Sequence, residues 1–281
     1  MTAAEYAAQH NLPRVGARPA LGSYLKQAWE RRDFALELAR ARLKSGNERN
    51  RLGMLWVVIQ PTMNAVMYGF IFGILQTSKP ADFPVYVVIG VFLFEFFSAS
   101  VGQGAKAITG NGSLVQSLAF PRITLPFAAV LQQFLALMPV LGVMFVFCML
   151  LGTMPKLSWL LIIPLLAIYS VFNFGIALIC ARLTVHLRDF TQIIPIIIRV
   201  LFFTSGVLFG IERVTKAIPA AEPLFAFHPI YQTLQIARGV IMDGAVYSSS
   251  AWIVVSGWAL VLLVSGIFFF WSAEEQYGRV N

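Results

Sequence analysis

Charged residues are scarce in this sequence, because Asp, Glu, Lys and Arg together make up only 12% of its 281 residues. Hydrophobic residues make up 58%, and the mean hydropathy is +0.74. Ordinary soluble domains carry about 25% charged residues and are about half apolar. The shortage of charge therefore excludes an ordinary soluble domain and predicts an all-α integral membrane protein.

Residues that commonly build catalytic or metal centres are also few. The three histidines, His10, His186 and His228, are too scattered to match a metal-ligand spacing. The two cysteines, Cys148 and Cys180, both lie in apolar runs, which favours buried thiols over a disulfide framework. We therefore expect no metal site, and the lack of a polar acid/base cluster argues against a membrane-embedded enzyme.

A phosphate-binding loop is missing too. No Gly-x-x-x-x-Gly-Lys-Ser/Thr motif occurs, and the nearest glycine-rich stretch, Gly102-Gln103-Gly104, lacks the lysine and the strand–helix setting. The chain is thus expected to contain no nucleotide-hydrolysing site and to bind no cofactor of its own.

Long apolar runs fill most of the chain. Six of them approach the ~20 residues that a helix needs to cross a bilayer. They predict a transmembrane domain of six helices over residues 52–272, with the C-terminus on the same side as the N-terminus. The predicted spans are Gly53–Leu75, Val85–Gly104, Phe127–Leu151, Leu157–Ala181, Ile193–Phe209 and Trp252–Trp271.

Basic residues orient these spans. With the N-terminus inside, fifteen Lys and Arg residues fall on the cytoplasmic side and five outside, while Arg199 lies within a span. This bias predicts a multi-pass membrane protein with both termini in the cytoplasm. It also accounts for the net charge of +8 without a nucleic-acid partner.

The two ends of the chain are polar. Residues 1–20 are expected to form a disordered cytoplasmic tail, and residues 273–281 a short cytoplasmic C-terminal tail. The first apolar run begins only near Leu52, which is too deep in the chain for a cleaved signal peptide.

Residues 21–51 show the pattern of an amphipathic helix, with a second piece that begins near Asp33. Because a span follows almost at once, we expect this segment to lie in the membrane plane on anionic headgroups rather than in solution. The apolar stripe of the first piece contains Leu21, Tyr24, Leu25, Ala28 and Trp29, and the basic residues of the second are Arg40, Arg42 and Lys44.

The segment between the fifth and sixth spans, residues 210–250, is long and semi-apolar. After Pro229, the residues Ile230, Leu234 and Ala237 share one helical face, and Gly239 marks a stop. Because few charges occur there, the pattern favours a short re-entrant helix in the outer leaflet over a soluble extracellular hairpin.

Two ionisable residues lie in the middle of spans, Glu95 in the second and Arg199 in the fifth. Charges at such depth usually face the bundle interior or water and have a partner. We therefore predict that Glu95 and Arg199 lie at similar depth and pair, within one chain or across a subunit interface. A protonated, hydrogen-bonded Glu95 is the alternative.

Residues 111–126 form a semi-polar interruption between two apolar runs. The basic-residue bias places it in the cytoplasm, where a soluble partner could contact it. Pro121 and Pro126 are expected to separate a short docking helix from the third span.

Short motifs follow one another along residues 21–281. They are Leu52-Gly53-Met54-Leu55-Trp56 with Gln60-Pro61, then Asn111, Leu114 and Val115, Phe120-Pro121-Arg122 with Leu125-Pro126, Arg188-Asp189, Pro229, Arg238 and Tyr277-Gly278-Arg279. Their order resembles the permease subunits of ABC-2 type exporters, in particular the Wzm/TagG-like group that moves lipid-linked polysaccharides such as O-antigen, cell-wall galactan and teichoic acid. Two departures are His228, where that family often has Asn, and Ser117, where a basic residue is common.

The resemblance implies a homodimer of permeases in a bacterial inner or plasma membrane, joined to two copies of a separate ATPase that binds ATP and Mg²⁺. The implied substrate is a glycan on an undecaprenyl diphosphate-type lipid. The rival interpretations are an ABC-2 exporter of a drug, lipid or siderophore and a membrane-embedded transferase.

Three sets of site residues are expected on this basis. Arg51, Arg122 and Arg188 stand at inner ends of spans and are candidates to bind the diphosphate, although positive-inside topology alone also places arginines there. Aromatic rings stack on the apolar faces of sugars, or simply pack against lipid and neighbouring helices, and the candidates for a glycan path are Trp56, Tyr68, Phe92 and Phe96. The expected coupling contact with the ATPase is Asn111, Leu114, Val115, Leu118, Phe120 and Pro121.

Overall fold

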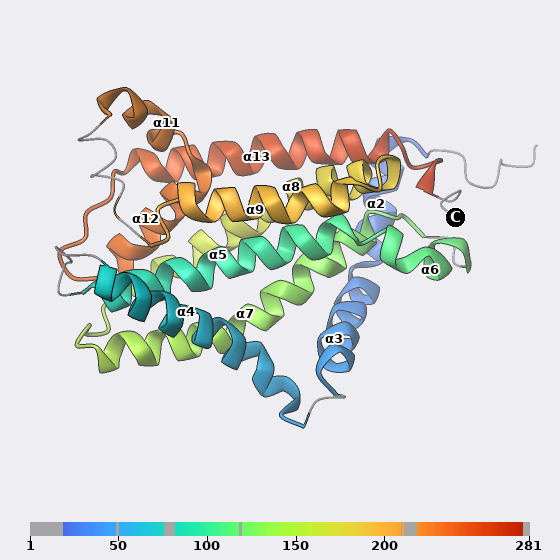
Figure 1. Ribbon diagram of the computed structural model, residues 1–281. Helices are drawn as coiled ribbons and strands as arrows, with labels where there is room; N and C mark the ends of the chain where they lie inside the picture. Colours follow the sequence, from blue (N-terminus) through green and yellow to red (C-terminus); the bar gives the residue numbers. More distant parts are fainter. Residues whose placement is uncertain are drawn as a thin grey trace, which may run out of the picture.

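The computed structural model describes residues 19–48, 51–75, 82–117, 120–208, 210 and 218–277. Every regular element in these ranges is a helix. The long helices run side by side along one direction, with short helices at both ends of the bundle (Figure 1). The prediction of an all-α membrane protein is confirmed for this part of the chain. The expected N-terminal tail lies almost wholly outside the described residues.

Five helices are long and apolar enough to cross a bilayer, judged by length and composition. Their limits agree with five of the predicted spans to within a few residues, because each predicted span is a continuous apolar run. They are Gly53–Leu75 (η1, Gly53–Leu55, continued by α4, Trp56–Leu75), α5 (Phe83–Ala105), α7 (Thr124–Leu150), Leu157–His186 (η3, Leu157–Leu161, continued by α8, Ile162–His186) and α13 (Ser250–Trp271).

The remaining predicted span, Ile193–Phe209, corresponds to the shorter helix α9 (Phe190–Thr204). Its 15 residues extend over about 22 Å, less than the ~30 Å hydrocarbon core of a bilayer. The helix ends because Gly206, the residue after the C-cap Ser205, adopts a left-handed φ of 66°. Helices commonly end with a glycine in this conformation just after the C-cap. The structure thus has five helices of spanning length among its described residues, and a sixth full span is not established.

The two ends of the bundle carry different short helices (Figure 1). One end holds α2 (Leu21–Glu30), α3 (Arg32–Glu48), α6 (Gly112–Ser117) and the C-terminal segment, and α3 packs against α7. The indole Nε1 of Trp271 donates to the carbonyl oxygen of Pro19 at 2.9 Å, so both ends of the described chain meet there. We call this the inner end, since the charge bias predicts that it faces the cytoplasm.

Within residues 21–51, for which an amphipathic segment is predicted, the structure has the two helices α2 and α3. Tyr24, Ala35 and Ala39 are buried against the bundle, whereas Trp29 is 68% exposed. An exposed tryptophan beside basic residues suits a membrane interface, and the in-plane orientation remains a prediction.

The outer end holds η4 (Pro219–Ala221), α11 (Glu222–Ala226) and α12 (Pro229–Ile241). Ile230, Leu234 and Ala237 are all buried, as their shared face predicted, and α12 packs on α5, α8 and α13. That α12 lies within the outer leaflet stays a prediction.

The limits of α12 have local causes. Nδ1 of His228 accepts a hydrogen bond from the backbone N–H of Tyr231 at 3.2 Å, so this residue caps the helix as an asparagine would. The predicted stop at Gly239 is wrong, because the helix continues to Ile241. A Cβ at Gly239 would lie 2.2 Å from Cδ1 of Tyr247, so the glycine makes room for that ring.

Helix α5 is the centre of the bundle and contacts α4, α7, α8, α9 and α12. Behind it, α8 and α13 approach so closely that they need glycine at the contact. A Cβ at Gly175 would lie 2.5 Å from the carbonyl carbon of Leu262, and one at Gly266 would lie 2.6 Å from the carbonyl oxygen of Gly175. Small residues permit such approach of membrane helices.

We expect Gly175→Ala to lower the unfolding free energy by about 1–3 kcal/mol, since the added methyl group overpacks a backbone contact. Thermal unfolding of the purified protein in detergent measures the effect. The control is Gly257→Ala in α13, where a Cβ meets nothing within 4 Å. Equal melting temperatures for the two variants would contradict the proposed packing.

Candidate functional site

The inner end joins the loop of residues 111–126 to the amphipathic segment. Nη2 of Arg42 donates to Oδ1 of Asn111 at 2.8 Å, and Nδ2 of Asn111 donates to the carbonyl oxygen of Ala107 at 2.7 Å. The rings of Phe34 and Phe120 lie 5.5 Å apart, which adds an apolar contact between the same two segments. Asn111 therefore connects α3 to the inner end of α5.

The other residues expected to couple to a partner surround this contact. Val115 is buried (5% exposed) and Pro121 is buried, whereas Leu114 on the short helix α6 is half-buried. Leu118 lies outside the described residues. Leu114 is thus the apolar side chain of α6 that remains partly accessible to another chain.

A second inner-end contact brings together three segments that are distant in sequence. The hydroxyl group of Tyr24 donates to Oε2 of Glu274 at 2.7 Å and accepts from the backbone N–H of Ile123 at 3.1 Å. The backbone N–H of Arg122 donates to Oε1 of Glu274 at 3.1 Å, and its Nη1 lies 3.4 Å from the same oxygen. We call Tyr24, Arg122 and Glu274 the inner-end cluster.

Burial controls the electrostatics of the inner-end cluster, because the side chains of Arg122 and Glu274 are only 17% and 4% exposed. Burial raises the pKa of Glu274 above its usual range, and the hydrogen bonds from Arg122 and Tyr24 oppose that rise. Burial and the nearby Glu274 raise the pKa of Tyr24. Its hydroxyl group therefore stays protonated and donates a hydrogen bond to the carboxyl group.

The three arginines predicted to bind a diphosphate have different surroundings. Arg51 and Arg188 are exposed near the inner ends of spans. Arg122 instead directs its guanidinium group at Glu274 and at the carbonyl oxygen of that residue, 3.0 Å away. Its first role is therefore to hold the C-terminal segment, and headgroup binding by any of the three remains a prediction.

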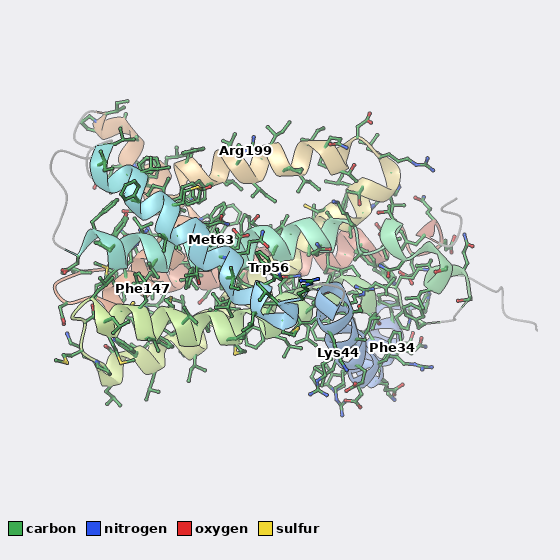
Figure 2. All side chains as sticks on the ribbon, turned by 60° about the horizontal axis from the view of Figure 1, so that its bottom comes forward. Phe34, Lys44, Trp56, Met63, Phe147 and Arg199 are labelled. Atoms are coloured by element: carbon green, nitrogen blue, oxygen red, sulfur yellow. The ribbon has the colours of Figure 1, made fainter. Side chains whose placement is uncertain are left out.

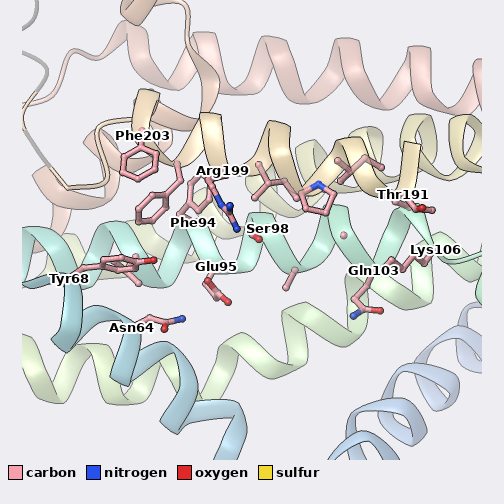
Figure 3. Close-up of a pocket in the computed structure, with 18 residues that line it drawn as sticks. Asn64, Tyr68, Phe94, Glu95, Ser98, Gln103, Lys106, Thr191, Arg199 and Phe203 are labelled. Atoms are coloured by element: carbon pink, nitrogen blue, oxygen red, sulfur yellow. The ribbon is translucent and has the colours of Figure 1, made fainter. Parts of the chain in front are cut away.

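A groove follows one face of α5. It consists of a cavity of about 470 Å³ between α4, α5 and α9 and a second of about 390 Å³ between α4, α5 and α7, and Glu95, Ala99 and Gln103 line both. Figure 3 shows Asn64 and Tyr68 of α4 and Glu95 of α5 on one side, with Arg199 of α9 directed toward α5 near Ser98. Lys106 and Thr191 line the inner part of the first cavity.

Glu95 and Arg199 line the same cavity, as their predicted depth requires. Within the described part of the chain, however, the two side chains form no ion pair, and Arg199 is exposed on α9 (Figure 2). Pairing across a subunit interface remains a prediction.

The aromatic residues predicted to line a glycan path divide into two kinds. Tyr68 lines the first cavity and packs against Phe202 in a tilted arrangement, with ring centroids 5.2 Å apart, and Trp56 lines the second. Phe92 and Phe96 also border the second cavity but are only 2% and 3% exposed. These two rings chiefly pack in the core around α5.

At the outer end, Arg238 of α12 is buried, with 1% exposed. Its Nη1 and Nη2 donate to the carbonyl oxygens of Gly206 and Val207, both at 3.0 Å, just beyond the end of α9. Nη2 also donates to the carbonyl oxygen of Tyr86 at 3.3 Å, and the guanidinium carbon lies 3.3 Å from that residue's ring centroid. A Cβ at Gly90 would lie 2.5 Å from Nη2, so glycine is needed beside the guanidinium group.

Sequence reasoning placed Arg238 only in an outer loop and Glu274 only in a tail. The sequence around Arg238 does not indicate a partner 32 residues away, and the sequence around Glu274 does not indicate one 152 residues away. No group of three or more metal-ligating side chains occurs in the described ranges.

The comparisons with known proteins agree with the motif order. Residues 38–242 match the family described as ABC-2 type transporter. The chain is 24% identical to the O-antigen export system permease protein RfbA of Klebsiella pneumoniae over 250 residues, which cover 88% of this chain and 95% of that protein.

Two further relatives show the same extent of similarity. The RfbA protein of Myxococcus xanthus is 23% identical over 255 residues, covering 91% of this chain and 98% of its own. The polysialic acid transport protein KpsM of Escherichia coli is 22% identical over 244 residues, covering 86% and 93%. The predicted relation to polysaccharide-export permeases is confirmed, and the chain belongs to the ABC-2 type transporter family.

Proposed function

We propose that this protein is the permease subunit of an ATP-driven exporter of a polysaccharide. The observation that carries the proposal is its similarity to O-antigen and polysialic acid export permeases over nearly the whole length of each chain. The absence of a phosphate-binding loop in the sequence supports a separate ATPase chain. The permease itself is a transport subunit rather than an enzyme.

The assembly we infer is a homodimer of this chain with two copies of the ATPase, in a bacterial inner or plasma membrane. The substrate is a glycan attached to an undecaprenyl diphosphate-type lipid. It is taken from the cytoplasmic side and moved along the groove beside α5, with Trp56 and Tyr68 at its wall. Exposed arginines such as Arg51 and Arg188 supply cations for the diphosphate.

ATP binding on the partner is transmitted through two connected segments, the loop of residues 111–121 and helix α3. The loop of residues 111–121 contacts the ATPase, and the hydrogen bond between Asn111 and Arg42 passes its movement to α3. Since α3 packs on α7, a shift of this loop changes the wall of the groove.

Depletion of this protein in its host cell, followed by analysis of lipid-linked intermediates, tests the function. Full-length glycan lipid is expected to accumulate inside the cell. Loss of glycan synthesis would favour a transferase, and normal surface glycan with altered drug, lipid or siderophore efflux would favour the other exporters.

Leu114→Asp is expected to uncouple the partner's ATP hydrolysis from transport while the dimer stays folded. A carboxylate at this half-buried apolar position cannot be buried in an interface at low cost. We expect export to fall by about tenfold or more, because a weakening of the contact with the ATPase by about 1.4 kcal/mol already corresponds to a tenfold change. Export per ATP hydrolysed by the purified complex measures coupling.

The matched control is Ser113→Asp, which adds the same charge at an exposed neighbouring position of α6. It should retain most of the export. Unchanged coupling in Leu114→Asp would contradict a docking role for α6.

A further inference from the structure

Six polar side chains of the groove have no hydrogen-bond partner in the described part of the chain. They come from three helices and meet around the region that the two cavities share. They are Gln60 and Asn64 on α4, Glu95 and Gln103 on α5, and Gln132 and Gln133 on α7.

Several hydroxyl groups elsewhere in the spans need no ligand. The hydroxyl groups of Thr62, Ser170 and Ser265 each donate to the carbonyl oxygen four residues earlier in the same helix, at 2.6–2.7 Å. Such a bond satisfies a hydroxyl group without any ligand. The side-chain amides and carboxyl group of the groove have no such bond, and an unpaired polar group in hydrocarbon is costly. Ser100, Tyr169 and Asn173 also lack a partner among the described residues, but they are buried in the core and line neither cavity.

The spacing of these residues makes one continuous polar face. On α4, Gln60 and Asn64 are four residues apart and therefore lie on one side of the helix. On α5, Glu95 and Gln103 are eight residues apart and line both cavities. Most of the other residues of α5 are buried and apolar, including Phe92 and Phe96, and Ser98 adds a hydroxyl group to the first cavity. The groove thus carries hydrogen-bonding groups beside apolar and aromatic side chains such as Phe94 and Phe202.

Amides and a carboxylate suit a particular ligand chemistry. Each Gln or Asn side chain donates two and accepts two hydrogen bonds, and a carboxylate accepts on both oxygens. Neighbouring hydroxyl groups on a sugar ring can both donate to one carboxylate, while the amides serve hydroxyl groups in either role. Amides on three sides also accept successive sugars in changing orientations.

We propose that Glu95 and the five surrounding amides form a binding site for the hydroxyl groups of a polyhydroxylated chain passing along the groove. This inference rests on the proposed export of a glycan. Glu95 and the five amides are then the residues that contact the glycan as it passes. Hydrogen bonding at this site, more than stacking on Phe92 or Phe96, then determines affinity for the chain.

The test compares two probes on the purified permease–ATPase complex in lipid nanodiscs. One is a linear neutral galacto-oligosaccharide, and the other is the same molecule with every hydroxyl group O-methylated. Methylation keeps the apolar ring faces but removes all hydroxyl donors. We expect the methylated probe to bind at least about tenfold more weakly, as loss of several hydrogen bonds predicts.

Variants locate the site. Glu95→Leu and the double change Gln132→Leu with Gln133→Leu should each weaken binding of the unmodified probe by about tenfold, whereas Glu95→Gln should retain most of the affinity. Thr62→Val on α4 is the matched control, because its hydroxyl group is satisfied within its own helix. It should bind like the wild type.

Export of native glycan is measured in cells carrying the same variants. Equal binding of the two probes, or unchanged binding in both the Glu95→Leu and the glutamine variants, would overturn the site. If the wild type still exports glycan in that case, the proposed function stands without this site. A wild type that neither binds the unmodified probe nor exports glycan would overturn both.

Discussion

Replacement of Glu274 by alanine is expected to lower the unfolding free energy by about 3 kcal/mol, which is typical of breaking a buried, hydrogen-bonded charge pair. The change removes the acceptor of the Tyr24 hydroxyl group and of the Arg122 backbone N–H. It also leaves the Arg122 guanidinium group, 17% exposed, without its carboxyl partner. Chemical or thermal unfolding in detergent measures the loss.

The matched control is Glu37→Ala, which breaks the ion pair between Glu37 and Arg40 on α3. The nitrogen and oxygen of that pair are 2.7 Å apart, but the side chains of Glu37 and Arg40 are 69% and 58% exposed. Water screens such a pair, so we expect a loss of at most about 1 kcal/mol. If the two variants lost similar stability, the inner-end cluster would have no special structural role.

The inner-end cluster also bears on coupling. It fixes α2 and the C-terminal segment to the residues just before α7, and α3 continues directly from α2. A movement that begins at the loop of residues 111–121 therefore acts on a rigid junction. Export by Glu274→Ala should fall further than its remaining folded fraction explains.

Replacement of Arg238 by leucine is the second change with a large expected effect, again about 3 kcal/mol or more. Leucine fills part of the volume but removes the guanidinium donor from the carbonyl oxygens of Tyr86, Gly206 and Val207. The oxygen of Gly206 then keeps the hydrogen bond from the Tyr86 hydroxyl group. Because Arg238 is 1% exposed, water cannot readily replace the guanidinium group. The end of α9 should then separate from α12.

Arg238→Lys distinguishes geometry from charge. A lysine keeps the charge but cannot direct two nitrogens at separate carbonyl groups, so it should recover only part of the stability. The outer-end control is Lys156→Met, which removes a half-exposed ion pair with Asp243 and should change stability by at most about 1 kcal/mol. Full recovery by lysine would contradict the role assigned to the planar guanidinium group.

Much of the helical architecture could be predicted because length and apolarity alone determine a span. The first span was predicted as Gly53–Leu75, and the structure has the same limits. The end of α9 was not predictable in this way, since the apolar sequence continues beyond Thr204 while Gly206 turns the backbone.

The functional residues were harder to predict. The spans are predominantly apolar, and aromatic rings occur on more than one side of α5, so periodicity does not tell which ring faces a groove and which faces the core. Phe92 and Phe96 were therefore assigned to a path, although they are almost fully buried. The amides Gln132 and Gln133 were overlooked because each is unremarkable until α4, α5 and α7 bring five amides and Glu95 together.

Long-range contacts explain the other omissions. Glu274 and Arg122 are 152 residues apart, and Arg238 and Tyr86 are separated by the same number. A single sequence gives the type of each residue but not its partner, and positive-inside topology already accounts for an arginine at an inner helix end. Only the packing of α2, α7 and α13 shows that Arg122 holds the C-terminal segment.

ATP-dependent transport of a labelled lipid-linked glycan into sealed proteoliposomes tests the central claim most directly. The vesicles contain this protein and its partner ATPase, with the ATPase on the outside, and the glycan that reaches the lumen is measured by its protection from an added glycosidase. We predict protected glycan only when both proteins and hydrolysable ATP are present, and a strong loss with Leu114→Asp in place of the wild type. Protection that does not require ATP, or new glycosidic bonds formed by this protein alone, would contradict the assignment as an exporter permease.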